Sequence, residues 1–205
     1  MTEPSPEHPP IAAPLGSVTT ARLDLRPLRA EHRSGLAPVF AKPEVWQYPL
    51  GRGFTRSETE AFLDRQVHSW ATRGFGLWLA VERSTNRAVG FVGLSVPTFL
   101  AEILPAVEVG WRLDPDAWGK GYATEGARAA LDEAFTTLGL AEVCSIVQTE
   151  NIASMRVAER AGLRQVRTIE VAATEQRGAL EAVLLAITRD EWVRASQHPT
   201  VRPRE

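Results

Sequence analysis

The segment that most constrains the fold is VEVGWRLDPDAWGKGYATEGARAALDEAF, residues 107–135. Apolar and polar side chains alternate over residues 106–113, which is typical of a strand with one buried face. Residues 124–139 place apolar side chains at helical spacing and end at a glycine. A glycine-rich turn, residues 117–126, lies between them. The chain must therefore place a strand, a tight turn and an amphipathic helix in direct succession.

The rest of the chain shows the same two periodicities. Alternation predicts strands at residues 17–28, 75–82, 88–96, 141–150, 163–171 and 179–189, with residues 83–87 as a hairpin turn. Helical spacing predicts helices at residues 30–41, 57–74 and 151–162. Ser57 and Glu60 form a capping-box pattern at the start of the second of these helices, and Asn151 and Gly162 are typical end residues for the third. This order of elements predicts an α+β (mixed α/β) fold.

Length and terminal composition predict one domain. A chain of 205 residues suits a single domain, which we expect to span residues 17–194. Residues 1–16 contain five prolines and are expected to be disordered. Residues 195–205 have a similar character and are expected to form a flexible tail.

Charge and composition exclude several classes of function. The net charge of −2 provides no overall basic field for nucleic acid. The single cysteine, Cys144, excludes an internal disulfide framework and a cysteine-based zinc site, and no metal is expected. No apolar run is long enough to span a membrane, and the N-terminal residues do not resemble a signal peptide. We therefore expect a cytoplasmic protein that binds neither nucleic acid nor membrane.

The glycine-rich turn suggests two hypotheses. Glycines at 119 and 121 could simply serve a tight turn. Alternatively, the first N–H groups of the following helix have no internal partners, and small residues up to Ala123 and Thr124 would let a diphosphate approach them. The spacing of a P-loop and that of a dinucleotide fingerprint are both absent. If the strands at 106–113 and 142–150 are neighbours, the helix that Asn151 begins would face the same cleft, which suits a long ligand with phosphates at one end.

Several segments together resemble the GNAT acyltransferase superfamily, and in particular its ribosomal-protein N-acetyltransferase branch of the RimJ/RimL type. The resemblance rests on residues 107–135 and on NIASMRVAERAGL, residues 151–163, with support from ARLDLRPL, AVGFVGL and LLAITRDEW. It implies a splayed, mostly antiparallel sheet of about seven strands with helices on both faces. It also implies acetyl-CoA as co-substrate and direct transfer of its acetyl group to an amine in a ternary complex.

The family pattern for diphosphate binding, [RQ]-x-x-G-x-[GA], falls on residues 118–123. Gly121 and Ala123 match it, whereas Trp118 replaces the arginine or glutamine; backbone N–H groups make the contact, so this departure is tolerable. The resemblance also implies that the strand backbone at 111–113 pairs with the cofactor arm and polarises the acetyl carbonyl. Asn151 matches an asparagine that contacts this arm, or is only a helix cap. The resulting cofactor-binding set is Trp111, Arg112, Leu113, Trp118, Gly119, Lys120, Gly121, Tyr122, Ala123, Thr124, Asn151 and Ser154.

The acid and the base are less directly indicated. Many superfamily members carry a catalytic tyrosine seven positions after the asparagine, where this chain has Ala158. Ser154 stands where the resembling branch has a serine, and it is our candidate acid, the alternative being a helix serine bonded to the backbone. Glu108 is our candidate base, the alternative being an ion pair with Arg112 on the same strand face.

The acceptor is not specified by the sequence. The resemblance places the loop at residues 42–54, with Trp46 and Tyr48, over the acceptor site, and the apolar segment 96–106 could line that site or a subunit interface. A protein N-terminus or a small-molecule amine would serve as acceptor, for a monomer or a homodimer. Two other classes stay open: a non-catalytic acyl-CoA-binding or regulatory domain, and a nucleotide-binding module that uses the glycine turn for another phosphate.

Overall fold

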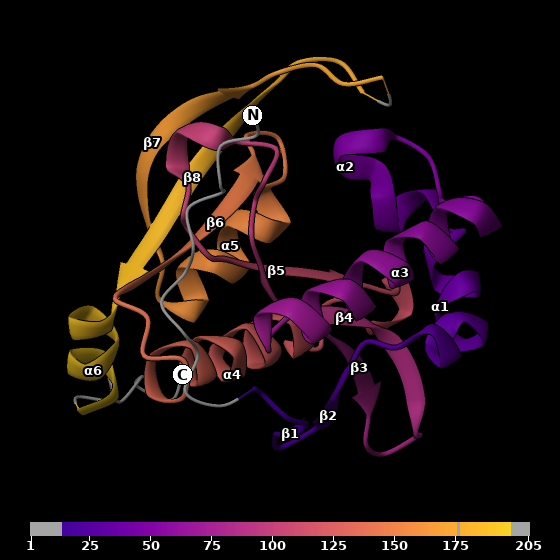
Figure 1. Ribbon diagram of the computed structural model, residues 1–205, viewed down its shortest axis with the longest axis horizontal. Helices are drawn as coiled ribbons and strands as arrows, with labels where there is room; N and C mark the ends of the chain where they lie inside the picture. Colours follow the sequence, from indigo (N-terminus) through magenta and orange to yellow (C-terminus); the bar gives the residue numbers. More distant parts are fainter. Residues whose placement is uncertain (1–13, 176, 198–205) are drawn as a thin grey trace.

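The structure, a computed structural model, describes residues 14–175 and 177–197. Eight strands form one sheet in the order β1-β2-β3-β4-β5-β6-β8-β7 (Figure 1). The strands are β1 (Val18–Thr19), β2 (Leu23–Pro27), β3 (Leu77–Glu82), β4 (Arg87–Ser95), β5 (Glu108–Leu113), β6 (Glu142–Gln148), β7 (Arg164–Val171) and β8 (Leu180–Thr188). The helices are α1 (Arg33–Phe40), α2 (Gln47–Leu50), α3 (Arg56–Arg73), α4 (Tyr122–Thr136), α5 (Ile152–Ala161) and α6 (Arg189–Gln197), with short 3-10 turns η1 (Ala30–His32), η2 (Pro43–Trp46), η3 (Ala101–Ile103) and η4 (Pro115–Ala117).

The predicted fold class is confirmed. All neighbouring strands are antiparallel except β5 and β6, which are parallel. The eighth strand arises because the first predicted strand, residues 17–28, folds back on itself as β1 and β2. The N–H of Thr20 donates to the carbonyl of Leu23 at 2.8 Å and closes the turn between them.

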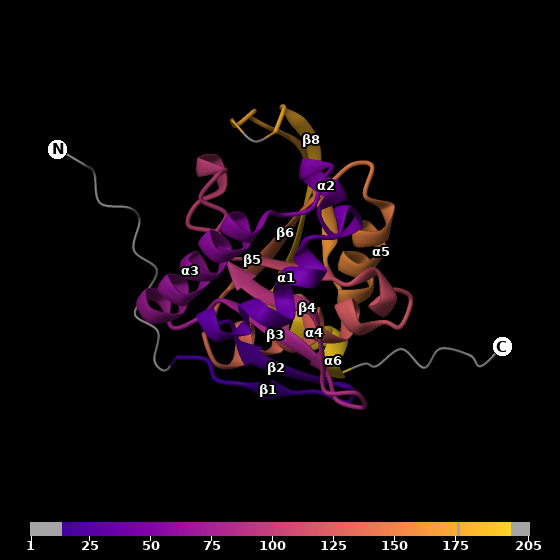
Figure 2. The ribbon, with the colours of Figure 1, turned by 90° about the vertical axis from the view of Figure 1, so that its right-hand side faces the viewer.

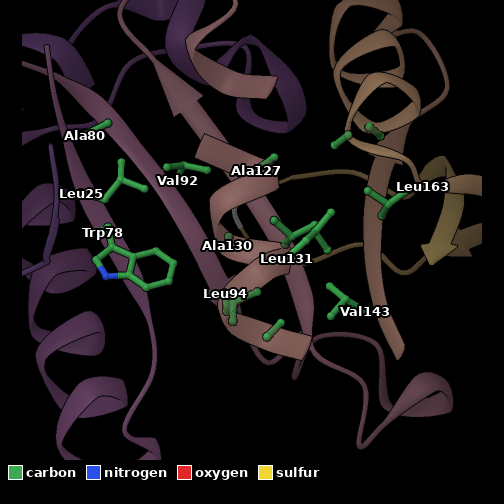
Figure 3. Packing of buried hydrophobic residues seen from close by; sticks show 14 of the residues in the cluster. Leu25, Trp78, Ala80, Val92, Leu94, Ala127, Ala130, Leu131, Val143 and Leu163 are labelled. Atoms are coloured by element: carbon green, nitrogen blue, oxygen red, sulfur yellow. The ribbon is translucent and has the colours of Figure 1, made fainter. Parts of the chain in front are cut away.

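Helices cover both faces of the sheet, as expected, and Figure 2 shows α3 on one side and α5 on the other. On one face, Leu36, Phe40 and Leu63 of α1 and α3 pack against β3 and β4. On the other face, α4 and α5 pack against the strands in the largest apolar cluster (Figure 3). The labelled members of that cluster are Leu25, Trp78, Ala80, Val92, Leu94, Ala127, Ala130, Leu131, Val143 and Leu163.

Small residues let α4 lie close to the sheet. Ala127, Ala130 and Ala134 are fully buried against it. A Cβ at Gly126 would lie 2.6 Å from Cγ1 of Val92, which is closer than real Cβ atoms come. Gly126, the third glycine of residues 117–126, lies within α4 and is required by packing, whereas Gly119 and Gly121 precede the helix and have another role.

The starts of α3 and α4 differ from the predicted ones, and one helix was not predicted. α3 begins one residue earlier than predicted because Thr55, not Ser57, is its N-cap: the Thr55 side chain accepts from the N–H of Glu58, and the Glu58 carboxylate accepts from that of Thr55. α4 begins at Tyr122 rather than at residue 124, with Gly121 as N-cap. α6 follows β8 directly and was not predicted, whereas α5 has the Asn151 cap and the Gly162 end that the sequence indicates.

The folded domain extends slightly beyond residues 17–194. Leu15 is buried, and its N–H donates to the carbonyl of Gly74 at 2.8 Å. The carbonyl of Gly16 accepts from Nε1 of Trp78, also at 2.8 Å. At the other end, α6 continues to Gln197. The rest of the segment expected to be disordered (residues 1–13 of 1–16) and of the expected flexible tail (residues 198–205 of 195–205) lies outside the described residues.

Candidate active site

The sheet opens between its two parallel strands. β5 and β6 have a single paired register, Glu108 opposite Cys144, where the N–H of Cys144 donates to the carbonyl of Val107 at 2.9 Å. The N–H of Ile146 donates instead to the Glu108 carboxylate at 3.3 Å. This pair confirms the predicted adjacency of the two strands. Beyond it, no further pairing between the described residues holds β5 to β6, and a gap opens along them.

Backbone groups of β5 face this gap. Peptide groups alternate between the two neighbours of a strand. Because the carbonyl of Val107 points toward β6, those of Trp111 and Leu113 do as well, whereas the peptide groups of Arg112 point toward β4. The Leu113 carbonyl accepts from Nε1 of Trp118 at 2.8 Å, which folds the following loop back onto the end of β5. Trp111 thus offers its N–H and carbonyl to a bound molecule in the gap.

The glycine loop, residues 118–124, presents free donors. None of the six N–H groups from Gly119 to Thr124 has an acceptor among the described residues. Gly119 and Gly121 have φ angles of 73° and 80°, the left-handed region in which glycine is favoured. A Cβ at Gly119 would meet nothing within 4 Å, so the loop is open to the outside. The glycines therefore serve a tight turn, and the six unpaired donors at the positive end of α4 would fit a diphosphate, which stays a prediction.

A polar network beneath the loop holds it in place. The Tyr122 hydroxyl donates to the Glu82 carboxylate at 2.5 Å, and Nζ of Lys120 lies 3.7 Å from the same carboxylate. Nη1 of Arg22 donates to the Lys120 carbonyl at 2.7 Å, while Arg22 also pairs with Glu125 at 2.6 Å. The side chains of Lys120 and Tyr122 therefore support the loop, and its backbone is left for ligand binding.

A cavity of about 600 Å³ runs along the gap and contains both candidate catalytic residues. Glu108, Trp111 and Arg112 line it from β5, and Asn151 and Ser154 from the start of α5. The loop at residues 42–54 lines the other side, as the resemblance implies. In Figure 1 the hairpin between β7 and β8 extends toward α2, and residues of both elements line the cavity. Leu113 and the glycine loop are not part of its lining; they lie where β5 leaves it.

Glu108 has the electrostatics of a base that works near neutrality. Burial raises its pKa to about 7, against the opposing effects of the Ile146 N–H and the positive charge of Arg112. Between Glu108 and Arg112, both of them described residues, there is no ion pair within 4 Å; Nη1 of Arg112 donates instead to the carbonyl of Val45 at 2.8 Å. The structure thus separates the two groups that the ion-pair alternative would join.

Ser154 has a free hydroxyl beside the cavity. Its backbone N–H donates to Oδ1 of Asn151 at 3.1 Å, so Asn151 is a helix cap. The hydroxyl of Ser154 has no partner among the described residues, so the backbone-bonded alternative is not realised here. Ala158, where the superfamily tyrosine would stand, is buried. Ser154 is therefore the available hydroxyl on α5 at the cavity.

Sequence patterns did not reveal two unpaired polar atoms in residues that line the cavity. Nε1 of Trp46 and Oε1 of Gln148 are buried without a partner in the described part of the chain. Trp46 is only 6% exposed and stacks on Phe54, with ring centroids 3.6 Å apart, while the Arg112 guanidinium lies 4.3 Å from its ring. Such atoms show no periodicity or motif in a sequence, because only tertiary packing decides whether a polar atom finds a partner.

A match to a known family identifies this fold. Residues 22–164, more than half of the chain, match the acetyltransferase (GNAT) domain. The chain belongs to the GNAT acetyltransferase family. A GNAT acetyltransferase from Bacillus anthracis shares the fold with a TM-score of 0.71 and 21% identity, over 85% of this chain and 99% of that one. A putative ribosomal-protein-serine acetyltransferase from Vibrio cholerae has a TM-score of 0.70 and 19% identity, over 86% and 99%.

One GNAT relative matches nearly the whole chain. An FsC-acetyl coenzyme A-N(2)-transacetylase of Aspergillus fumigatus is 38% identical over 201 residues, covering 90% of this chain and 81% of the relative. GNAT acetyltransferases use acetyl-CoA as co-substrate, and this chain is an acetyl-CoA-dependent N-acetyltransferase. Within residues 14–175 and 177–197, no helix is long and apolar enough to cross a membrane.

Proposed function

We propose that this GNAT enzyme transfers the acetyl group of acetyl-CoA directly to the nitrogen of an amine, with Glu108 as base and Ser154 as acid. One observation carries the proposal: the carboxyl group of Glu108 and the free hydroxyl of Ser154 line the same cavity along the gap between β5 and β6. The name of the Aspergillus relative, which specifies acetyl coenzyme A and an N(2) acceptor, supports transfer to nitrogen. A binding-only domain would have no need of a carboxyl group with a pKa of about 7 there.

Binding follows from the free backbone donors. We propose that the N–H groups of the glycine loop hold the diphosphate of acetyl-CoA, and that the cofactor arm runs along the gap beside Trp111 and Asn151. The N–H of Trp111 then stabilises negative charge on the acetyl oxygen during transfer. The residues present fit this role because the loop is open and the β5 edge is unpaired.

The proton balance of the reaction assigns the roles of Glu108 and Ser154. Acetyl-CoA supplies a thioester carbonyl carbon, to which the amine nitrogen bonds as the carbon–sulfur bond breaks. Glu108, when ionised, accepts the proton that the amine loses. The Ser154 hydroxyl donates a proton to the departing sulfur and is restored from water. An amide and free CoA result, with no covalent bond to the protein.

Product formation tests the proposed function. Purified protein with acetyl-CoA and a panel of primary amines should release CoA, and mass spectrometry should show at least one amine gaining an acetyl group. Acetyl-CoA, but not ATP, should raise the melting temperature, because selective binding stabilises the native state. Stabilisation by acetyl-CoA without any acetylated amine would favour the binding-only alternative, and stabilisation by ATP alone would favour the nucleotide module.

The role of Ser154 makes a separate prediction. Ser154→Ala should lower kcat by about 100-fold, the range of a lost acid catalyst, with little change in acetyl-CoA affinity. Single-turnover kinetics and calorimetric titration would measure the two quantities. Ser84→Ala, in the exposed turn between β3 and β4, is the matched control. An unchanged kcat for Ser154→Ala would leave the serine without a catalytic role.

A further inference from the structure

The charges around the cavity are unbalanced. Four charged side chains line it: Arg65, Arg112, Arg177 and Glu108. Three are guanidinium groups, which stay protonated at neutral pH. The Arg65 side chain has no bonded partner among the described residues, and the Arg177 guanidinium donates there to the carbonyls of Ala172 and Gly178 in its own hairpin. The cavity that receives the acceptor is therefore positively charged, with one carboxyl group at the reaction centre.

Arg112 is the half-buried member of this set that packs against the loop at residues 42–54. Only its Nη1 has a protein acceptor, the Val45 carbonyl, so its other N–H donors face the cavity region without a partner in the described chain. Burial lowers the pKa of Arg112 to about 10, and Glu108 opposes this effect. Beside the guanidinium lies the indole of Trp46, whose buried Nε1 also lacks an acceptor. The remaining donors of the Arg112 guanidinium are thus available to an oxygen ligand in the cavity.

The space over β5 between the side chains of Glu108 and Arg112 is open. Side chains on one face of β5 come from Glu108, Gly110 and Arg112, because successive residues alternate between the faces. A Cβ at Gly110 would meet nothing within 4 Å, and Gly110 lies opposite Gly93 of β4, which also has no side chain. A small molecule can therefore lie over the glycine with one end toward each charge.

We propose that the acceptor is an amino acid: a small molecule that carries a free amine and a carboxylate. Its amine meets Glu108, and its carboxylate binds the guanidinium of Arg112 beside the indole of Trp46. The inference rests on the proposed function and specifies its substrate class. A plain amine would leave the remaining guanidinium donors of Arg112 without an acceptor from the ligand, and an uncharged amide would leave the guanidinium without a counter-charge. Sites with unpaired polar groups discriminate strongly against ligands that fail to pair them.

Matched acceptors test this inference. Leucine, β-alanine, 4-aminobutyrate and 6-aminohexanoate would each be compared with the corresponding amide and the corresponding decarboxylated amine. Acetylated product would be quantified by mass spectrometry, and kcat/KM expressed per unprotonated amine. For at least one of the four acids, this kcat/KM should be about 100-fold higher than that of the corresponding amide and that of the corresponding decarboxylated amine. The four spacings allow for the unknown separation of amine and carboxylate.

Variants then assign the preference to Arg112. Arg112→Met keeps an apolar chain against Trp46 and removes the charge, so kcat/KM for the preferred acid should fall by about 100-fold and that for its decarboxylated amine much less. Arg56→Met removes an exposed guanidinium on α3 and should preserve the preference. An equal fall for both acceptors in Arg112→Met would indicate a merely structural residue and contradict the assignment.

The outcomes separate the inference from the function on which it rests. Acetylation of amines with no preference for any acid over its amide and amine would overturn the inference and leave the acetyltransferase function standing. Absence of acetylation for every amine tested would overturn both.

Discussion

Gly121→Glu should weaken acetyl-CoA binding by about 100-fold or more. The substitution places a carboxylate at the N-cap of α4, among six N–H groups that have no acceptor in the described chain. Like charges in direct contact cost several kcal/mol, so the new carboxylate would repel a diphosphate and would itself occupy the donors. Isothermal titration calorimetry with acetyl-CoA measures the effect.

A matched glycine separates this effect from backbone strain. Gly121 has a φ angle of 80°, and a residue with a side chain costs about 1–2 kcal/mol in that region. Gly139, near the other end of α4, has a φ angle of 69° and is exposed, so Gly139→Glu carries the same strain far from the glycine loop. It should lower stability without changing acetyl-CoA affinity. Equal affinities in Gly121→Glu and wild type would refute the diphosphate assignment.

Glu108→Gln should lower kcat/KM by about 100- to 10,000-fold, the usual contribution of a general base. Because the pKa of Glu108 is about 7, the wild-type carboxyl group is ionised and able to accept a proton only above that pH. Wild-type kcat/KM should therefore rise with pH through about 7, and the variant should lack this limb. A pH series of initial rates tests both statements. Glu102→Gln, which removes an exposed carboxylate of η3, should change neither the value of kcat/KM nor its rise with pH.

Stability provides the control for folding. The folded-state pKa of Glu108, about 7, lies above the ordinary value of 4.5, so the folded protein binds the extra proton between these values. Its contribution to stability is present below pH 4.5 and is lost as the pH rises to about 7. Glutamine carries no charge, so the stability of Glu108→Gln relative to wild type should increase over that range in denaturant titrations. A slow variant that is also less stable at pH 8 than at pH 5, relative to wild type, would contradict this account of Glu108.

Local signals in the sequence were sufficient where short-range chemistry decides the structure. The alternation at residues 106–113 gives β5, and the Asn151 and Gly162 signals give the ends of α5. The same signals were ambiguous where two similar patterns overlap: Ser57 and Glu60 repeat the spacing of Thr55 and Glu58, and only the latter pair forms the capping box. The first predicted strand became two strands because a turn at residues 20–22 is compatible with the alternation on either side of it.

The sequence by itself determined the order of strands and helices from α3 to β8, the glycine loop before α4 and the family, because each depends on residues that are neighbours along the chain. Tertiary structure alone decided which polar groups remain unpaired. Glu108 is near Ile146 rather than bonded to Arg112, and Trp46 meets Arg112 from a loop more than sixty residues earlier. Burial, pKa and unsatisfied hydrogen bonds arise from contacts between distant segments, and a local pattern does not encode them.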